Sequence, residues 1–439
     1  MTHPTNFRRD PLLIHAAGAI SLLAWVALAV RSGGGPHGLP WAMLGAQGLA
    51  WAALLVAFTR ASAVPLRAVW IWAVLFRCAG LFATPVLEDD WFRFLWDGRM
   101  FALTGNPYAT VPLASFGDSG VPEPFQRVLD QVNHPDVPTI YGPVCQAAFA
   151  ASYAVAPGRL WPWKVILLAA DLLAIFMIRR LARGWKPALF FAWCPLLIFE
   201  TSFNAHPESL AIAFLLGAIA ARRSASTAVL CAVAIGAKLF AFLLVPLILW
   251  SLPRRAWLIF GATLALLYAP FWLQGSAADL AGLRTMAAEW EFNSSVFALL
   301  RATISEQAAE SLCTSGFIAI WLGLAWLWMR RRAATPDAMR ELVRFSGLIF
   351  GSFLLLSPVV NPWYLLWLLP GVAVSPSPAG VVALAAVSLS YLTGLNLAHP
   401  ALRNFEHPGW LRPLEYGAIA VALLYDWCRR ITARAATAR

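Results

Sequence analysis

Residues 11–30 read PLLIHAAGAISLLAWVALAV, an apolar run without a charged side chain. A helix needs about 20 such residues to cross the hydrocarbon core of a bilayer. The run lacks the small-residue cleavage site of a removable secretory signal. We therefore expect it to form the first membrane helix of the protein.

The composition of the whole chain continues this pattern. Of its 439 residues, 60% are hydrophobic and only 13% are charged, and the mean hydropathy is +0.66. A soluble domain has about 25% charged residues. These values exclude a soluble enzyme, a disordered chain and a coiled coil. They predict an all-α polytopic integral membrane protein, a bundle of about 11–14 transmembrane helices.

Similar apolar runs recur along the chain and mark the expected crossings. These lie at roughly 11–30, 40–59, 68–87, 161–180, 186–203, 207–221, 226–238, 239–252, 256–274, 312–329, 345–360, 363–376, 379–397 and 414–428. The stretches 226–252 and 345–376 each resemble a pair of short or re-entrant helices, because irregular backbone within a membrane is tolerated where protein or water covers it. We expect one membrane domain over 1–439.

The net charge of +11 comes from 33 Lys and Arg against 22 Asp and Glu. Most of the arginine clusters occupy short loops, as the positive-inside rule requires of cytoplasmic loops, so they do not indicate nucleic-acid binding. These clusters share one side of the membrane if both termini are cytoplasmic and 139–157 does not cross fully. The extracytoplasmic side then receives a long first loop, 88–160, which we expect to contain interfacial helices.

The most informative motif opens this loop. EDDWFRFLWDGRMFALTGNPY begins with Glu88, Asp89 and Asp90. Arg93 and Asp97 share a helix face with Asp90, and aromatic residues fill the rest, a pattern typical of a helix in the headgroup layer. The GNPY turn ends the helix. A carboxylate fixed there suits a general base acting on a hydroxyl; alternatively, the acids only complement the dipole at a helix start.

A second polar motif of the loop is NHPDVPTIYGPVCQ, over residues 133–146. Its Asn133, His134 and Tyr141 stand among three prolines, which make the segment rigid. The amide and hydroxyl groups are suited to holding a sugar. A plain structural loop explains the same residues.

The motif FETSFNAHPESL places two acids inside an apolar region. Glu200 and Asn204 are four residues apart, and His206 and Glu208 flank a proline. Acids within a membrane are costly and are therefore candidates for function. These residues are suited to a substrate or a metal, although a shared His–Glu hydrogen bond would satisfy the same groups. The six cysteines show no metal-ligand spacing.

Lys238 is an isolated cation between two apolar runs, in AVAIGAKLFAFLLVPL. At the bilayer centre it would cost about 2.5–3.5 kcal/mol. At a turn between short helices it can reach a lipid phosphate as a point charge. Snorkelling of the side chain to the interface is the alternative.

Further polar residues stand in three later motifs, AAEWEFNSSVFALL, SPVVNPWYLLWLLP and NFEHPGWLRP. The candidates are Glu291, Asn293, Asn361, Trp363, Tyr364 and the neighbouring Arg403. Trp and Tyr favour the membrane interface in any case. Within the apolar runs, we expect Lys164 to pair with Asp171 on one helix face, and Arg77 to meet polar partners or a lipid headgroup.

In this order, the motifs resemble those of bacterial glycosyltransferases of the GT-C fold that use polyprenyl-phosphate sugars, and the mannosyltransferase-like members most. The resemblance spans residues 88–370. It implies transfer of a hexose, mannose foremost, from a polyprenyl-phosphate donor lipid to a hydroxyl of a glycan or lipid acceptor, with inversion at C1. The expected location is the extracytoplasmic face of the bacterial cytoplasmic (inner) membrane, among membrane lipids.

The resemblance also implies roles for individual residues. Asp90 or Asp89 fits the catalytic base by position, with Asp90 preferred, and Lys238 would hold the donor phosphate. The residues themselves independently suggest electrostatic stabilisation of the phosphate by Lys238 and an arginine such as Arg93 or Arg403. Residues expected at the substrates are Glu88, Asp97, Asn133, His134, Tyr141, Glu200, Asn204, His206, Glu208, Glu291, Asn293, Asn361, Trp363 and Tyr364. No cofactor is required, and a divalent metal is not expected because a lipid monophosphate leaves with less charge than a nucleoside diphosphate.

Other classes of membrane protein remain as alternatives. A transporter or flippase would place charges near the midplane and usually show inverted repeats, whereas here the acids gather at one surface and no repeat is visible. A membrane scaffold and other lipid-linked enzymes are further alternatives. A phosphoryl transferase would need more cations near its acids, and an acyltransferase a His/Ser pair.

Overall fold

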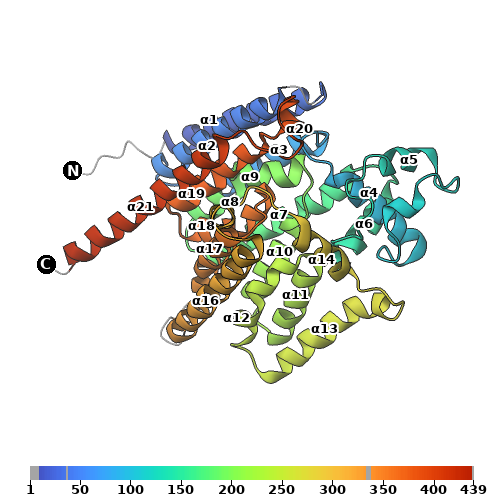
Figure 1. Ribbon diagram of the computed structural model, residues 1–439. Helices are drawn as coiled ribbons and strands as arrows, with labels where there is room; N and C mark the ends of the chain where they lie inside the picture. Colours follow the sequence, from blue (N-terminus) through green and yellow to red (C-terminus); the bar gives the residue numbers. More distant parts are fainter. Residues whose placement is uncertain (1–8, 36–37, 333–337, 438–439) are drawn as a thin grey trace. The chain divides into compact units, whose positions relative to one another are not determined.

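The computed structural model describes residues 9–35, 38–332 and 338–437, which are mostly helical (Figure 1). Within these ranges there is no β-strand, only an isolated bridge between Phe292 and Val359. Five of the described helices are long and apolar enough to cross a membrane: α1 (Arg9–Ser32), α2 (Leu39–Arg60), α7 (Trp161–Leu181), α13 (Arg254–Trp272) and α16 (Glu306–Arg332). This confirms the prediction of an all-α, multi-pass membrane protein.

The chain divides into two compact units. The first comprises residues 1–76, 181–198 and 291–439, and the second comprises 77–180 and 199–290. Besides α1, α2, α16 and most of α3 (Leu66–Leu81), the first unit contains α8 (Lys186–Trp193), α9 (Pro195–Ile198), α15 (Val296–Arg301), α17 (Ala338–Leu356), η4 (Pro362–Trp367), α18 (Leu369–Val374), α19 (Pro378–Ala386), η5 (Val387–Tyr391), α20 (Gly394–Leu397) and α21 (Leu411–Thr437). In it, α1 packs on α2, α16 on α17 and α19 on α21.

The second unit is built on α7 and α13. Its other elements are α4 (Asp90–Thr104), η1 (Pro112–Ser115), α5 (Glu123–Leu129), α6 (Pro143–Val155), η2 (Phe199–Phe203), α10 (Glu208–Ala220), α11 (Ser224–Ala237), η3 (Leu239–Leu243), α12 (Val245–Leu249) and α14 (Asp279–Glu289). Helix α4 lies beside α6, and α11 packs between α10 and α13 (Figure 1).

Several predicted boundaries are confirmed. Helix α4 begins at Asp90 and ends where Gly105 of the GNPY turn adopts a φ of 72°, a conformation that glycine takes without strain. The apolar stretch 226–252 breaks at Lys238 into α11, η3 and α12, and 345–376 likewise divides into α17, η4 and α18. The short pieces expected in both stretches are therefore present.

The end of α3 differs from the prediction. The helix stops at Leu81 instead of continuing to 87, because Pro85 disfavours helical backbone just before it. Lys164 donates to the carbonyl oxygens of Gly80 and Ala83, at 2.9 and 2.7 Å, and so satisfies acceptors at the end of the helix. The expected pairing of Lys164 with Asp171 is therefore wrong.

Asp171 instead pairs with Arg77. The guanidinium Nε lies 2.7 Å from Asp171 Oδ2, and both side chains are buried. The hydroxyl of Thr201 donates to the same carboxylate oxygen at 2.8 Å. The prediction of a buried polar partner for Arg77 is confirmed, and this cluster ties α3, α7 and η2 together.

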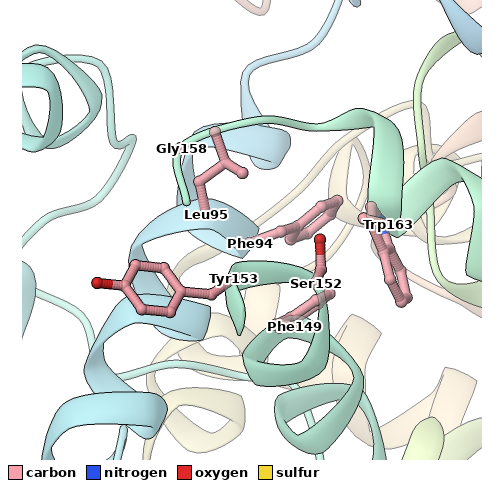
Figure 2. A pocket seen from close by; sticks show the side chains of 7 residues that line it. All are labelled: Phe94, Leu95, Phe149, Ser152, Tyr153, Gly158 and Trp163. Carbon is pink, nitrogen blue, oxygen red and sulfur yellow. The ribbon is translucent and has the colours of Figure 1, made fainter. Parts of the chain in front are cut away.

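Helix α4 is held tightly against α6. A Cβ atom at Gly98 would lie 2.5 Å from the carbonyl oxygen of Phe149, so only glycine permits this approach. The ring of Phe94 stacks on that of Phe149 with centroids 4.9 Å apart. Figure 2 shows the adjoining small pocket, which is lined by Phe94, Leu95, Phe149, Ser152, Tyr153, Gly158 and Trp163. Close packing against α6 therefore fixes the position of α4 and of the acids at its start.

Candidate active site

The acids at the start of α4 are joined by two side chains from the loop 133–146. The Asn133 amide donates to Oδ1 of Asp89 at 2.6 Å and to Oδ1 of Asp90 at 3.3 Å. The Tyr141 hydroxyl donates to Oδ2 of Asp90 at 3.0 Å. These hydrogen bonds orient the Asp90 carboxylate. Because its side chain is still 22% exposed, a ligand can reach it.

Two buried residues of α4 keep this loop in place. The Arg93 guanidinium donates to Asp97 Oδ1 at 3.1 Å and to the carbonyl oxygen of Val137 at 2.6 Å. Asp97 also accepts hydrogen bonds from Thr139 and Gln146. Because the middle of the loop is fixed in this way, its ends bring Asn133 and Tyr141 to the acids. Arg93 and Asp97 thus contact protein groups beneath the acids.

Burial and the neighbouring acids raise the affinity of Asp89 and Glu88 for protons. Burial raises the pKa of Asp89 to about 6, the neighbouring Asp90 charge adds to the effect, and the Asn133 hydrogen bond opposes it. Burial also raises the pKa of Glu88, with further contributions from Asp90, Asp89 and Glu200. Asp89 and Glu88 therefore bind protons at a pH where isolated carboxyl groups would be ionised.

A histidine extends the cluster towards η2, a turn of π-helix. Glu200 Oε2 accepts from the Asn204 amide at 3.2 Å and contacts His206 Nδ1 at 2.9 Å. The other ring nitrogen, Nε2, lies 3.9 Å from Asp90 Oδ2. The shared His–Glu hydrogen bond considered from the sequence is confirmed. Among the residues whose positions are described, no group of three or more His, Cys, Asp or Glu side chains is arranged to hold a metal ion.

Lys238 lies on the other side of Tyr141. Its Nζ is 2.8 Å from Oε1 of Glu208, which is fully buried, and 5.4 Å from the centre of the Tyr141 ring. The approach depends on Gly142, where a Cβ atom would be 2.3 Å from the carbonyl oxygen of Gly236. A cation is thus placed next to the tyrosine that contacts Asp90.

His134, at the other end of the loop, has a different environment. Its φ is 46°, and its ring lies edge-on to Trp290 with centroids 4.7 Å apart. Its carbonyl oxygen faces Arg93 Nη1 at 3.5 Å. In this structure His134 therefore shapes the loop.

The remaining sequence candidates belong to the first unit. Glu291 accepts hydrogen bonds from Ser294 at 2.6 Å and Arg412 at 3.3 Å and pairs with Arg301. Asn293 has a φ of 47° and donates to both oxygens of Glu415, at 3.0 and 3.3 Å. These contacts connect the EFNSS segment to the start of α21.

Three candidates lie at or inside η4, and one lies in a surface loop. Asn361 precedes η4 and is buried, as is Trp363, whose ring is 5.9 Å from that of the half-buried Tyr364. Arg403 is exposed, and its backbone N–H donates to Glu406 at 3.0 Å.

Sequence reasoning missed two residues that hold candidate site residues in place, Tyr108 and Glu415. Tyr108 of the GNPY motif donates to the carbonyl oxygen of Tyr141 at 2.8 Å, so this motif both ends α4 and supports the acid-binding tyrosine. Glu415 is 1% exposed and contacts Asn293. The signal for Glu415 was an acid at the edge of an apolar run, since such residues are expected to have a polar partner.

Comparison with known protein families gives two matches. The alpha-(1->6)-mannopyranosyltransferase N-terminal domain matches residues 13–254, and the MptB C-terminal domain matches residues 292–425. The first match alone covers more than half of the chain and includes Asp90, His206 and Lys238. No curated protein and no solved structure matches the chain.

Proposed function

Because the chain belongs to the alpha-(1->6)-mannopyranosyltransferase family, we propose that it transfers mannose from a polyprenyl-phosphate donor to a hydroxyl group of a glycan or lipid acceptor. The position of Asp90 supports both the proposed donor and the proposed mechanism. This accessible carboxylate is oriented by the hydroxyl of Tyr141, and the Lys238 cation lies 5.4 Å from the centre of the same tyrosine ring. Such an arrangement provides a base for an alcohol and a positive charge for a phosphate.

Asp90 acts as the general base. Its Oδ2 accepts the proton of the acceptor hydroxyl while the acceptor oxygen bonds to C1 of the mannose and the bond from C1 to the phosphate oxygen breaks. The electron pair of that bond leaves with the lipid phosphate. A single displacement inverts C1, so a β-linked donor gives the α-linkage in the family's description. Asp90 is preferred to Asp89 as the base because the Tyr141 hydroxyl orients its carboxylate.

Lys238 binds the departing phosphate. Glu208 fixes the ammonium group at 2.8 Å, and the Tyr141 ring lies next to it. A cation that is already positioned stabilises developing negative charge without reorganisation. The buried Arg93 holds the loop through Asp97 and Val137. The mechanism requires no cofactor and no divalent metal.

The proposed reaction takes place at the extracytoplasmic face of the bacterial cytoplasmic membrane. Both termini are then cytoplasmic, and the loop 88–160 faces outward. The arginine clusters between the apolar runs support this orientation, because short cytoplasmic loops retain positive charge.

The test is a donor assay with purified protein in lipid vesicles. Polyprenyl-phosphate mannose, its glucose, galactose and arabinose analogues, and a nucleoside-diphosphate mannose are each offered with mannosylated glycan and glycolipid acceptors. We expect labelled mannose to move only from the polyprenyl donor, in the presence of EDTA, to give an α-linked product. Transfer from the nucleotide donor alone, or loss of transfer in EDTA with recovery in Mg²⁺ or Mn²⁺, would contradict the proposal.

A further inference from the structure

We propose that His206, held by Glu200, is a second proton acceptor that receives the acceptor proton from Asp90. This inference rests on the proposed function, because it requires Asp90 to act as a base. It gives η2 and the NAHPESL motif a role distinct from substrate contact. His206 acts through Asp90, so it is a positioning and proton-accepting residue.

The hydrogen bond to Glu200 sets the tautomer of His206. An ionised carboxylate only accepts hydrogen bonds, so the 2.9 Å contact requires the proton of the neutral imidazole to be on Nδ1. The other nitrogen, Nε2, then carries the lone pair. This is the atom that faces Asp90 Oδ2 at 3.9 Å. When Asp90 Oδ2 carries a proton, the lone pair of His206 Nε2 can accept it.

The distance of 3.9 Å exceeds that of a hydrogen bond. A single water molecule or a side-chain rotation of Asp90 bridges such a gap, and catalytic hydrogen bonds commonly shorten when substrate binds. His206 cannot approach solvent in place of Asp90, because its side chain is 1% exposed while that of Asp90 is 22% exposed. The acceptor alcohol therefore meets Asp90 first, and His206 stands behind it.

The backbone around His206 is fixed by three contacts. The His206 N–H donates to the Glu200 carbonyl oxygen at 2.8 Å, which closes the turn between the two residues. Ala205 has a φ of 68°, an unusual value for a residue with a side chain, and its carbonyl oxygen accepts from Trp163 Nε1 at 2.8 Å. Thr201, next to Glu200, is bound to Asp171. Such an anchored turn preserves the orientation of the imidazole.

The proton transfer is balanced within the site. The acceptor O–H bond breaks as the proton moves to Asp90, and the proton then passes from Asp90 Oδ2 to His206 Nε2. Asp90 returns to its carboxylate form, and the resulting imidazolium is stabilised by the negative charge of Glu200. The other charged groups of the cluster are Glu88 and Asp89 at the start of α4, and the Glu208–Lys238 pair.

The experiment measures kcat/KM for polyprenyl-phosphate mannose between about pH 5 and pH 8.5, with the full-length protein in lipid vesicles. The variants are His206→Gln, Glu200→Gln and the control His399→Gln, which alters an exposed histidine of the first unit. In the wild-type protein, the rate should fall on the acid side, because the proton acceptors of the reaction must be unprotonated to act.

His206→Gln should lower the rate at neutral pH by roughly 10²-fold and change the shape of this acid-side decrease, because only the carboxylates of the cluster then contribute to it. Glu200→Gln should retain the decrease but move it to lower pH, because a proton held in the cluster loses a neighbouring negative charge. His399→Gln should match the wild-type profile. If His206→Gln does not fold, as judged by size-exclusion chromatography in detergent, the displaced profile of Glu200→Gln carries the test.

The inference is overturned if His206→Gln keeps the wild-type pH profile, or if it lowers the rate equally at every pH, which is the effect of a purely structural histidine. It is also overturned if Glu200→Gln leaves the profile in place. Failure of the wild-type protein to transfer mannose would instead refute the proposed function, and the inference with it. The two failures are therefore distinguishable.

Discussion

Tyr141 donates a hydrogen bond to Oδ2 of Asp90 across 3.0 Å, although 51 residues separate the two in the chain. The contact exists because Arg93 and Asp97 hold the loop that carries the tyrosine. It orients the carboxylate while leaving part of it accessible. The behaviour of the proposed active site should therefore depend on this phenol.

Tyr141→Phe should lower kcat by roughly 10- to 100-fold, the value of one hydrogen bond to a charged group. The ring and its contact with Lys238 would remain, so KM for the donor should change little. Steady-state kinetics with polyprenyl-phosphate mannose checks this. Tyr153→Phe is the matched control, since Tyr153 also belongs to the second unit but lines the separate pocket of Figure 2. An unchanged kcat in Tyr141→Phe would remove the phenol from the reaction.

Lys238→Ala should weaken donor binding, because it removes the cation that we assign to the phosphate. We expect KM for the donor to rise by at least roughly tenfold, and Lys238→Arg to recover part of the loss since it restores the charge. Lys186→Ala is the control, as Lys186 lies over the rings of Phe58 and Trp185 in the first unit. Equal donor affinities in Lys238→Ala and the wild-type protein would indicate that Lys238 only forms the ion pair with Glu208.

The raised pKa of Asp89, about 6, predicts how stability depends on pH. The folded protein binds this proton more tightly than the unfolded chain, where the group has its usual pKa of 3.8. Stability from this group is therefore present at low pH, falls as pH rises from about 4 to about 6, and is level above that range. Thermal unfolding midpoints over this range should fall less steeply in Asp89→Asn than in the wild-type protein, and equal slopes would contradict the assignment.

The buried pair of Arg77 and Asp171 predicts a large effect on stability. Asp171→Ala leaves a buried guanidinium without its carboxylate and should destabilise the protein by about 3–5 kcal/mol. The double variant Arg77→Leu/Asp171→Leu should be considerably less affected, because it buries no unpaired charge. Unfolding of the purified protein in detergent measures both. A double variant as unstable as the single one would show that the ion pair itself is needed.

Sequence reasoning predicted the features that depend on local pattern. The apolar runs gave the helical membrane class, GNPY gave the end of α4, and the lone Lys238 marked a break between helices. Each follows from hydrophobic periodicity or from turn chemistry in a few neighbouring residues. The association of Glu200 with His206 was also within reach, since the two residues are close in sequence.

Contacts between distant residues could not be predicted in the same way. Lys164 and Asp171 share a helix face, yet each has its partner on another segment: the end of α3 for Lys164, and Arg77 for Asp171. The partners of Asp90 come from a loop whose path depends on buried hydrogen bonds to Asp97. Tyr108 was read only as part of a turn, because its partner, the Tyr141 carbonyl oxygen, carries no signature in the sequence.

The central claim is that Asp90 removes the proton of the acceptor hydroxyl. Its most direct test is a single-turnover measurement of mannose transfer from polyprenyl-phosphate mannose by Asp90→Asn, beside Asp130→Asn, which alters an exposed acid of the same loop. We predict that Asp90→Asn binds the donor and folds normally but transfers mannose about 10²–10⁴-fold more slowly, while Asp130→Asn transfers at the wild-type rate. Transfer by Asp90→Asn at the wild-type rate would contradict the account.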